Sequence, residues 1–216
     1  MGVSRPSAGQ RSNLYSDQRF TNWTPHDPFW SEAEALPMRL QPRAQVKRID
    51  EFALPIFDRK LNSGFLRPCS VEDVVATLDK VPNEFLVGLE GVWLMGGTEA
   101  QRNTKKFIYG MYSLSRIFLF PFAESRLELH WKSAPKPNVA RDYTRFGATI
   151  SATKGSGAVL RFDLESLRLF FLYDVLLHEI GHHVDRDHRA ENAERYATWF
   201  ADYQRARLSE VGTADR

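Results

Sequence analysis

The sequence of residues 163–185 is DLESLRLFFLYDVLLHEIGHHVD, a strongly apolar stretch with a helical pattern. Asp163 is a good helix N-cap, and Glu165 places a negative charge in the first turn, where the helix dipole favours it. Apolar residues then fall on nearly every side of the predicted helix, from position 167 to position 184. A helix that is apolar all round lies inside a protein. The stretch therefore predicts a buried helix that ends near Asp185.

The same stretch carries the motif His178-Glu179-Ile180-Gly181-His182, which has the pattern HExxH. Residues four apart lie on one face of a helix, so the neutral imidazoles of His178 and His182 can share one tetrahedral Zn²⁺. Glu179 would flank the ion without binding it and can take a proton from a metal-bound water. The alternative, a buried helix whose histidines are only hydrogen-bonded, is costly in such apolar surroundings. We therefore expect one zinc ion here, with Glu179 as the general base.

A third ligand is expected from the last predicted helix, residues 190–207, which follows a polar turn at residues 186–189. If the two helices form a tight antiparallel hairpin, position 194 lies opposite both positions 178 and 182. Glu194 is therefore the predicted third ligand. Small residues on the facing surfaces would allow the close approach that a short glutamate needs: Gly181, Ala190, Ala197 and Ala201.

Two further residues stay open as the third ligand. His188 gives the pattern HExxHxxDxxH, the spacing of a three-histidine site, which needs a sharp break in the chain where Asp185 stands. Glu191 is nearer the turn, and a solvated carboxylate favoured by the helix dipole is the better explanation of it.

Supporting residues are expected around the histidines. Asp174, Asp185 and Asp202 are candidates for orienting a ligand imidazole through its second nitrogen, and an ordinary surface salt bridge is the alternative for each. His183 points about 100° away from His182 around the helix, so it is expected to support a ligand or to pack in the core rather than to bind the metal.

The rest of the chain predicts an α+β fold with a small mixed β-sheet. Residues 1–45 are rich in Pro, Ser, Arg and Gln and are expected to be a disordered or loosely draped arm, before one domain at residues 46–216. Residues 46–61 have a helical spacing with a kink at Pro55, and Ser70 is the expected N-cap of a short helix to Lys80. Strands are predicted within residues 85–95, 107–122 and 127–131, and a hairpin joins 149–153 to 158–162.

Composition excludes several classes of protein. Among 216 residues, 29 are basic and 27 acidic, a net charge of +2 that is too balanced to indicate a nucleic-acid or membrane surface. The single cysteine, Cys69, excludes an intrachain disulfide and a cysteine-based zinc site. No apolar run is long enough to span a bilayer, and no apolar secretory segment follows Met1. We expect a cytoplasmic protein with no membrane partner, nucleic acid is not favoured, and the oligomeric state stays open.

The motif and its surroundings resemble the zincin metallopeptidases, whose signature is HExxH on a buried helix, here residues 176–183. Residues 194–201, ERYATWFA, are similar to the ExxAxxFA stretch of the gluzincin branch, which the ImmA/IrrE-type and minimal gluzincin peptidases share. The resemblance implies a zinc metalloendopeptidase with a peptide or protein substrate. It implies His178, His182 and Glu194 as zinc ligands and Glu179 as general base. It also implies that the strand before the active helix, residues 158–162, pairs with extended substrate.

Two alternative functions follow from the same residues. One is a non-catalytic zinc-binding interaction module, in which the arm contacts a partner or covers the cleft. The other is a zinc-dependent endoribonuclease, because one such family uses three histidines at the spacing that ends with His188. Its motif lacks a glutamate after the first histidine, so Glu179 argues against it.

Overall fold

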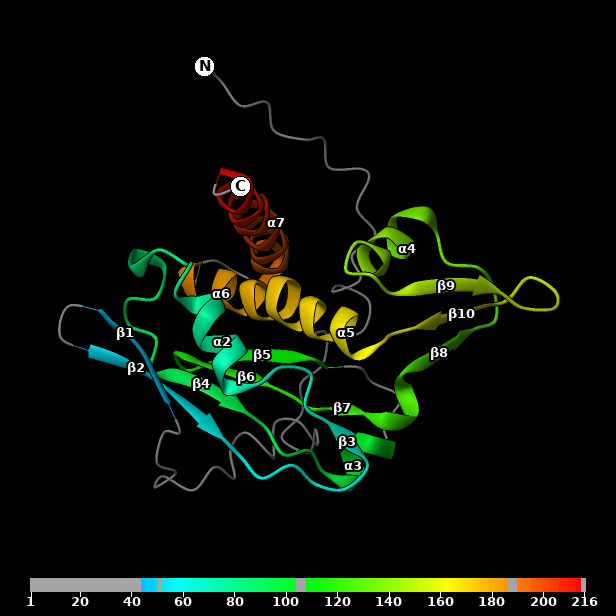
Figure 1. The fold of residues 1–216 in the computed structure, drawn as a ribbon, viewed down its shortest axis with the longest axis horizontal. Helices are drawn as coiled ribbons and strands as arrows, with labels where there is room; N and C mark the ends of the chain where they lie inside the picture. The colour runs from blue at the N-terminus through cyan, green and yellow to red at the C-terminus, as the bar shows by residue number, and fades with distance from the viewer. Residues whose placement is uncertain (1–43, 50–51, 104–107, 186–189, 215–216) are drawn as a thin grey trace, which may run out of the picture.

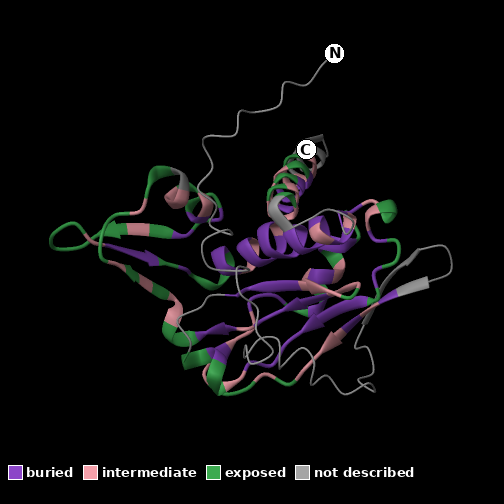
Figure 2. Cartoon of the chain, turned by 180° about the vertical axis from the view of Figure 1, so that it is seen from behind, coloured by how far each residue is buried: buried purple, intermediate pink, exposed green. Residues whose placement is uncertain are grey.

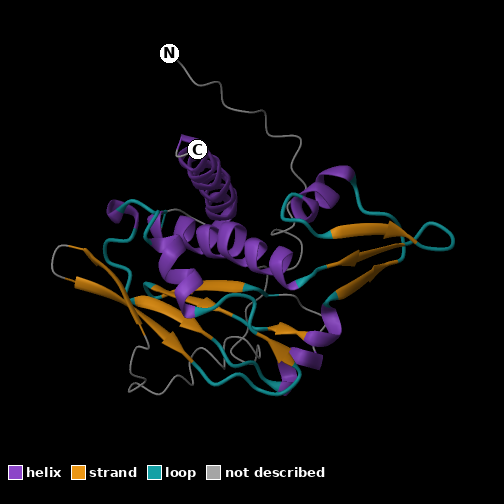
Figure 3. Ribbon diagram, viewed as in Figure 1, coloured by secondary structure: helices purple, strands orange, loops and turns teal. Residues whose placement is uncertain are grey.

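The computed structural model describes residues 44–49, 52–103, 108–185 and 190–214, which form an α+β fold (Figure 1; Figure 3). The predicted arm lies outside the described residues except at positions 44 and 45, which already belong to a strand. In the part of the chain that is described, no helix combines the length and the apolar composition that crossing a bilayer requires.

The main sheet is mixed and has five strands in the order β1-β2-β4-β6-β5. Their bounds are β1 Ala44–Ile49, β2 Phe52–Asp58, β4 Gly91–Leu94, β5 Gly110–Ser113 and β6 Arg116–Leu119. Strands β2, β4 and β6 are parallel, whereas β1 and β5 run antiparallel to their neighbours. Among the described strands, β5 is therefore an edge strand, and it contacts the predicted active helix.

The prediction of a helix over residues 46–61 is wrong. This segment forms the antiparallel hairpin β1–β2, in which Ile49 pairs with Phe52. Leu54 and Ile56 are buried while Pro55 between them is partly exposed, which is the period of a strand. A short apolar stretch can match the period of a helix as well as that of a strand. The parallel pairing of β2 with β4 makes this segment a strand.

A second, three-stranded sheet has the order β8-β10-β9 and packs with helix α4. Its members are β8 Glu128–Trp131, α4 Pro137–Thr144, β9 Thr149–Ala152 and β10 Ala158–Arg161. The predicted hairpin is confirmed, since Ala158 pairs with Ala152 and Arg161 with Thr149. The remaining short elements are β3 Phe65–Leu66, α2 Val71–Leu78, η1 Asn83–Phe85, α3 Glu99–Asn103, β7 Phe122–Ala123 and η2 Glu124–Arg126. The predicted N-cap of α2 is also confirmed, because Ser70 and Asp73 form a reciprocal capping box.

The apolar stretch forms one long helix, here called the central helix, made of α5 Leu164–Phe170, a π-helical segment Phe171–Leu176 and α6 Leu177–Val184. Asp163 caps it, accepting a hydrogen bond from the Ser166 N–H at 2.7 Å. Its residues are buried along almost the whole length (Figure 2), as predicted. The π-helical segment, which the sequence pattern did not indicate, ends two residues before His178; such segments occur often at functional sites.

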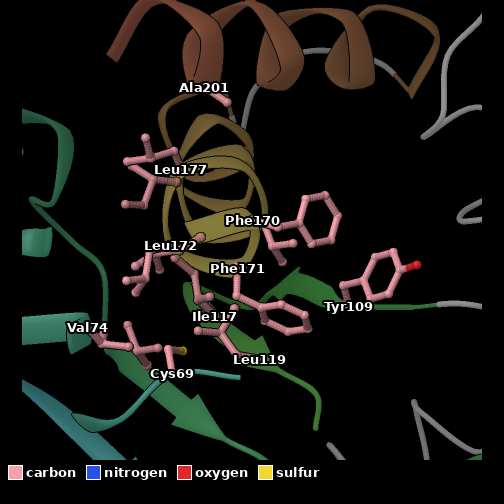
Figure 4. Packing of buried hydrophobic residues seen from close by; sticks show 14 of the residues in the cluster. Cys69, Val74, Tyr109, Ile117, Leu119, Phe170, Phe171, Leu172, Leu177 and Ala201 are labelled. Carbon is pink, nitrogen blue, oxygen red and sulfur yellow. The ribbon is translucent and has the colours of Figure 1, made fainter. Parts of the chain in front are cut away.

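The core forms where the central helix crosses the sheet. Phe171 and Leu172 point toward Ile117 and Leu119 of β6, and Cys69 lies beside the same cluster (Figure 4). Fully burying each such side chain stabilises the fold by about 1.5–3 kcal/mol. The sheet and the central helix therefore form one rigid support beneath the histidine motif.

Helix α7, Ala190–Ala214, packs against α6 and runs seven residues beyond the predicted end at 207. The two helices approach closely at Gly181, where a Cβ atom would lie 2.7 Å from the Cα of Ala197. Ala197 and Ala201 are both buried in this contact. The absence of a side chain at Gly181 thus sets the spacing of the helix pair.

Candidate metal centre

Three predicted ligand residues converge between α6 and α7. The Nε2 atoms of His178 and His182 are 3.1 Å apart, and each lies beside a different carboxylate oxygen of Glu194, at 3.3 Å and 3.2 Å. His178 is fully buried, and the side chains of His182 and Glu194 are 12% and 17% exposed. The donor atoms of the three residues all lie within 4.8 Å of one another, so the group could hold a metal ion.

The charge state of Glu194 suits a metal ligand. Burial by itself would raise the pKa of this carboxyl group, but hydrogen bonds with His178 and His182 outweigh burial and hold the pKa at about 2. Burial would lower the pKa of His182, but Glu194 and the nearby charges of Glu179 and Asp185 raise it overall. At neutral pH, Glu194 is therefore a carboxylate that faces both imidazoles.

Glu179 lies beside this group and is fully buried on the central helix. Its carboxylate packs against Gly110, the first residue of edge strand β5, where a Cβ atom would lie 2.7 Å from Oε1 of Glu179. Only a glycine leaves room for the glutamate at this position. Sequence reasoning missed Gly110, although a glycine inside an apolar strand pattern is a known signal of close backbone approach.

His183 has the packing role that was predicted. Its Nε2 lies 3.0 Å from the carbonyl oxygen of Val87 and its Nδ1 lies 3.1 Å from the hydroxyl of Tyr112. Because a carbonyl only accepts, Nε2–H donates to Val87 and Nδ1 accepts from Tyr112. These two hydrogen bonds of His183 therefore link the central helix to β5 and to the loop that carries Val87.

The acidic residues predicted to orient the imidazoles occupy other contacts. Asp174 is buried and accepts a hydrogen bond from Arg145 at 2.8 Å, and Asp202 accepts one from the same guanidinium at 3.3 Å. Arg145, the C-cap residue of α4, thereby links the π-helical segment to α7. Asp185 is the buried C-cap residue of α6, and its N–H donates to the carbonyl of Gly181 at 3.1 Å. A role for these carboxylates in orienting the imidazoles stays a prediction.

The described residues do not show where the side chains of the two alternative third ligands lie. His188 lies outside the described residues, and Glu191 lies in the first turn of α7 without a described side chain. His188 and Glu191 therefore stay predictions.

The prediction that residues 158–162 pair with an extended substrate is wrong. Strand β10, which covers most of residues 158–162, is the central strand of its sheet and pairs with β8 on one side and β9 on the other. No backbone edge is left for an added strand. The edge strand beside Glu179 is β5 instead.

Comparisons with protein-family models, with curated proteins and with solved structures gave no match.

Proposed function

We propose that the protein is a zinc-dependent metalloendopeptidase of the HExxH type, with zinc held by His178, His182 and Glu194. The observation that carries the proposal is the convergence of two imidazoles and one carboxylate beside a buried glutamate on one apolar helix. Four ligands at the usual zinc bond lengths of about 2.0–2.1 Å lie about 3.3 Å apart at the corners of a tetrahedron. The two Nε2 atoms, 3.1 Å apart, fit two of these corners, and the Glu194 carboxylate lies next to both, with one oxygen 3.3 Å from Nε2 of His178 and the other 3.2 Å from Nε2 of His182. Three protein ligands are typical of catalytic rather than structural zinc sites.

In this proposal the zinc ion and Glu179 have separate chemical roles. When bound, Zn²⁺ supplies Lewis acidity, which lowers the pKa of a coordinated water and polarises a carbonyl group. Glu179 accepts the proton of the water that attacks the peptide carbonyl carbon. It then donates this proton to the amide nitrogen as the carbon–nitrogen bond breaks. The products are a carboxylic acid and an amine, so atoms and protons balance.

The substrate peptide is proposed to lie along the outer edge of β5. This strand begins at Gly110, in contact with Glu179, and only β6 pairs with it among the described strands. An extended peptide added to such an edge gains backbone hydrogen bonds without a requirement for particular side chains. The scissile bond would then pass beside Glu179 and the two histidines.

The proposal is tested with three preparations of zinc-loaded protein: wild type, Glu179→Gln and His178→Ala. We expect one zinc per chain in wild type and in Glu179→Gln, and less than stoichiometric zinc in His178→Ala. Hydrolysis of an unfolded protein substrate should fall about 10²–10⁴-fold in Glu179→Gln, the usual contribution of a general base. Full activity in that variant would refute the mechanism. Stoichiometric zinc with no hydrolysis by wild type would favour the non-catalytic zinc-binding module.

A further inference from the structure

One guanidinium group bridges the two helices that carry the candidate metal ligands. Arg145 donates to Asp174 of the central helix at 2.8 Å and to Asp202 of α7 at 3.3 Å, with a different nitrogen for each carboxylate. The planar group of arginine holds its donors in fixed directions, so such a fork also fixes geometry. Arg205 reaches from α7 to the central helix as well, but its contacts with Asp174 and with the carbonyl oxygen of Tyr173 are longer, at 3.7 Å and 3.5 Å.

The bridge is anchored outside the helix pair. Arg145 is the C-cap residue of α4, which packs with the three-stranded sheet (Figure 1). The guanidinium groups of Arg145 and Arg205 lie 5.0 Å and 5.5 Å from the centre of the buried Phe146 ring. This ring contacts Phe170 of the central helix, with the ring centroids 5.7 Å apart. Because a cation is attracted to the face of an aromatic ring, Phe146 helps to hold both guanidinium groups in place.

Burial makes the bridge costly to break. The side chain of Asp174 is 4% exposed and that of Arg145 is 25% exposed. Burial raises the pKa of Asp174, and the charge of Arg205 opposes this effect. Removal of one partner from a buried ion pair leaves the other charge uncompensated, whereas replacement of both partners with apolar residues is often tolerated. This difference allows stability and helix position to be measured separately.

The bridge acts on the position of Glu194 through the contact between the two helices. They touch where Gly181 meets Ala197. At about 1.5 Å per residue, Glu194 lies about 4.5 Å from Ala197 along α7, and Asp202 lies about 7.5 Å from it on the other side. If α7 pivots on this contact, a shift of about 1 Å at Asp202 moves Glu194 by about 0.6 Å. Ligand geometry tolerates only about 0.5 Å, so a bridge that holds Asp202 also holds Glu194.

We propose that Arg145 is a positioning residue of the metal centre, through which the three-stranded sheet holds α7 and its Glu194 carboxylate against the two histidines. The inference rests on the proposed function, because it takes His178, His182 and Glu194 as the zinc ligands. Arg145 acts through α7 rather than on the ion or the substrate.

The test compares full-length wild type, Arg145→Met and Arg161→Met. Arg161 is the matched control, because it lies on β10 of the same three-stranded sheet and pairs with Glu128 of β8 at 2.7 Å. Zinc affinity, measured by competition with a chromogenic chelator, should fall about 10–100-fold in Arg145→Met and stay within about twofold of wild type in Arg161→Met. In Co²⁺-loaded protein, the visible absorption bands depend on ligand geometry and should change only in Arg145→Met. Wild-type zinc affinity or a wild-type cobalt spectrum in Arg145→Met would overturn the inference, as would an equal loss of affinity in Arg161→Met.

A double variant separates helix position from stability. Arg145→Met/Asp174→Leu replaces the buried pair with apolar residues, so the midpoint of urea unfolding of the metal-free protein should return towards that of wild type. Zinc affinity should stay low, because Asp202 still lacks its link to α4. Recovery of zinc affinity together with stability would show that the bridge acts only through stability and would overturn the inference. If Arg145→Met does not fold, Arg145→Lys keeps the charge but loses the fork, and wild-type zinc affinity in that variant would overturn the inference.

The inference and the proposed function fail in different ways. If wild-type protein hydrolyses peptides and Arg145→Met binds zinc as tightly as wild type, the positioning role fails and the peptidase proposal stands. If wild-type protein binds zinc but hydrolyses nothing, and Arg145→Met binds zinc more weakly, the positioning role stands and hydrolysis fails.

Discussion

Replacing Gly181 with alanine should weaken metal binding more than it weakens the fold. The added Cβ would lie 2.7 Å from the Cα of Ala197 and 3.1 Å from Cβ of Phe200. Carbon atoms in contact prefer about 3.5–4.0 Å, so α7 must move away from α6 by about 1 Å. Ligand geometry tolerates only about 0.5 Å, and loss of supporting contacts around a metal site costs about 10–100-fold in affinity. We therefore expect zinc affinity to fall about 10–100-fold as Glu194 retreats from the histidines.

The stability of the metal-free protein should change less, because two effects oppose each other. Overpacking costs about 1–3 kcal/mol, and alanine in a helix interior is favoured over glycine by about 1 kcal/mol. Competition with a chromogenic chelator measures the affinity, and urea unfolding of the metal-free protein measures the stability. The double variant Gly181→Ala/Ala197→Gly is the control. It should not recover binding, because the nearest clashing atoms belong to the backbone of Ala197. Wild-type zinc affinity in Gly181→Ala would refute the view that this contact places the third ligand.

Three further outcomes follow from the described contacts. Gly110→Ala should lower peptide hydrolysis at least about tenfold while one zinc stays bound. The new Cβ atom would lie 2.7 Å from Oε1 of Glu179 and would therefore displace this carboxylate. An unchanged kcat would contradict this prediction. Phe171→Ala should destabilise the protein by about 3–5 kcal/mol in urea unfolding, because the ring is fully buried, and a loss below about 1 kcal/mol would contradict that packing. Burial, aided by the charge of Asp73, raises the pKa of Cys69 from 9.0 to about 12, so its contribution to stability is present below pH 9.0 and is lost as pH rises towards 12. Urea unfolding at pH 8 and pH 10.5 should show a smaller loss of stability in Cys69→Ala than in wild type, and equal losses would argue against a buried neutral thiol.

Local interactions explain the predictions that the structure confirms. Ser70 and Asp163 cap their helices through hydrogen bonds to residues three positions on. The turn at residues 153–157 joins two strands that are neighbours in sequence. Each of these features depends on residues within a few positions of one another, so the sequence pattern is sufficient to predict it.

Pairing between distant strands explains the predictions that failed. The segment at 46–61 satisfied a helical spacing, and its pairing with β4, some 35 residues later, made it a strand. Strand β10 was expected at an edge, but β8 pairs with it from about 30 residues earlier. A one-dimensional pattern does not contain the partner of a strand, so it cannot say which strand is left at an edge.

The sequence by itself determined the helix, its burial and the histidine pair, because the spacing of four residues fixes the relation of His178 to His182 within one helical turn. It also narrowed the third ligand to a few residues, with Glu194 first among them. Only the tertiary structure brought the Glu194 carboxylate to 3.2 Å from His182 and set edge strand β5 against Glu179. The physical reason is that these contacts depend on how closely two helices pack and on which strand ends the sheet. Both are properties of the packed core rather than of any continuous segment.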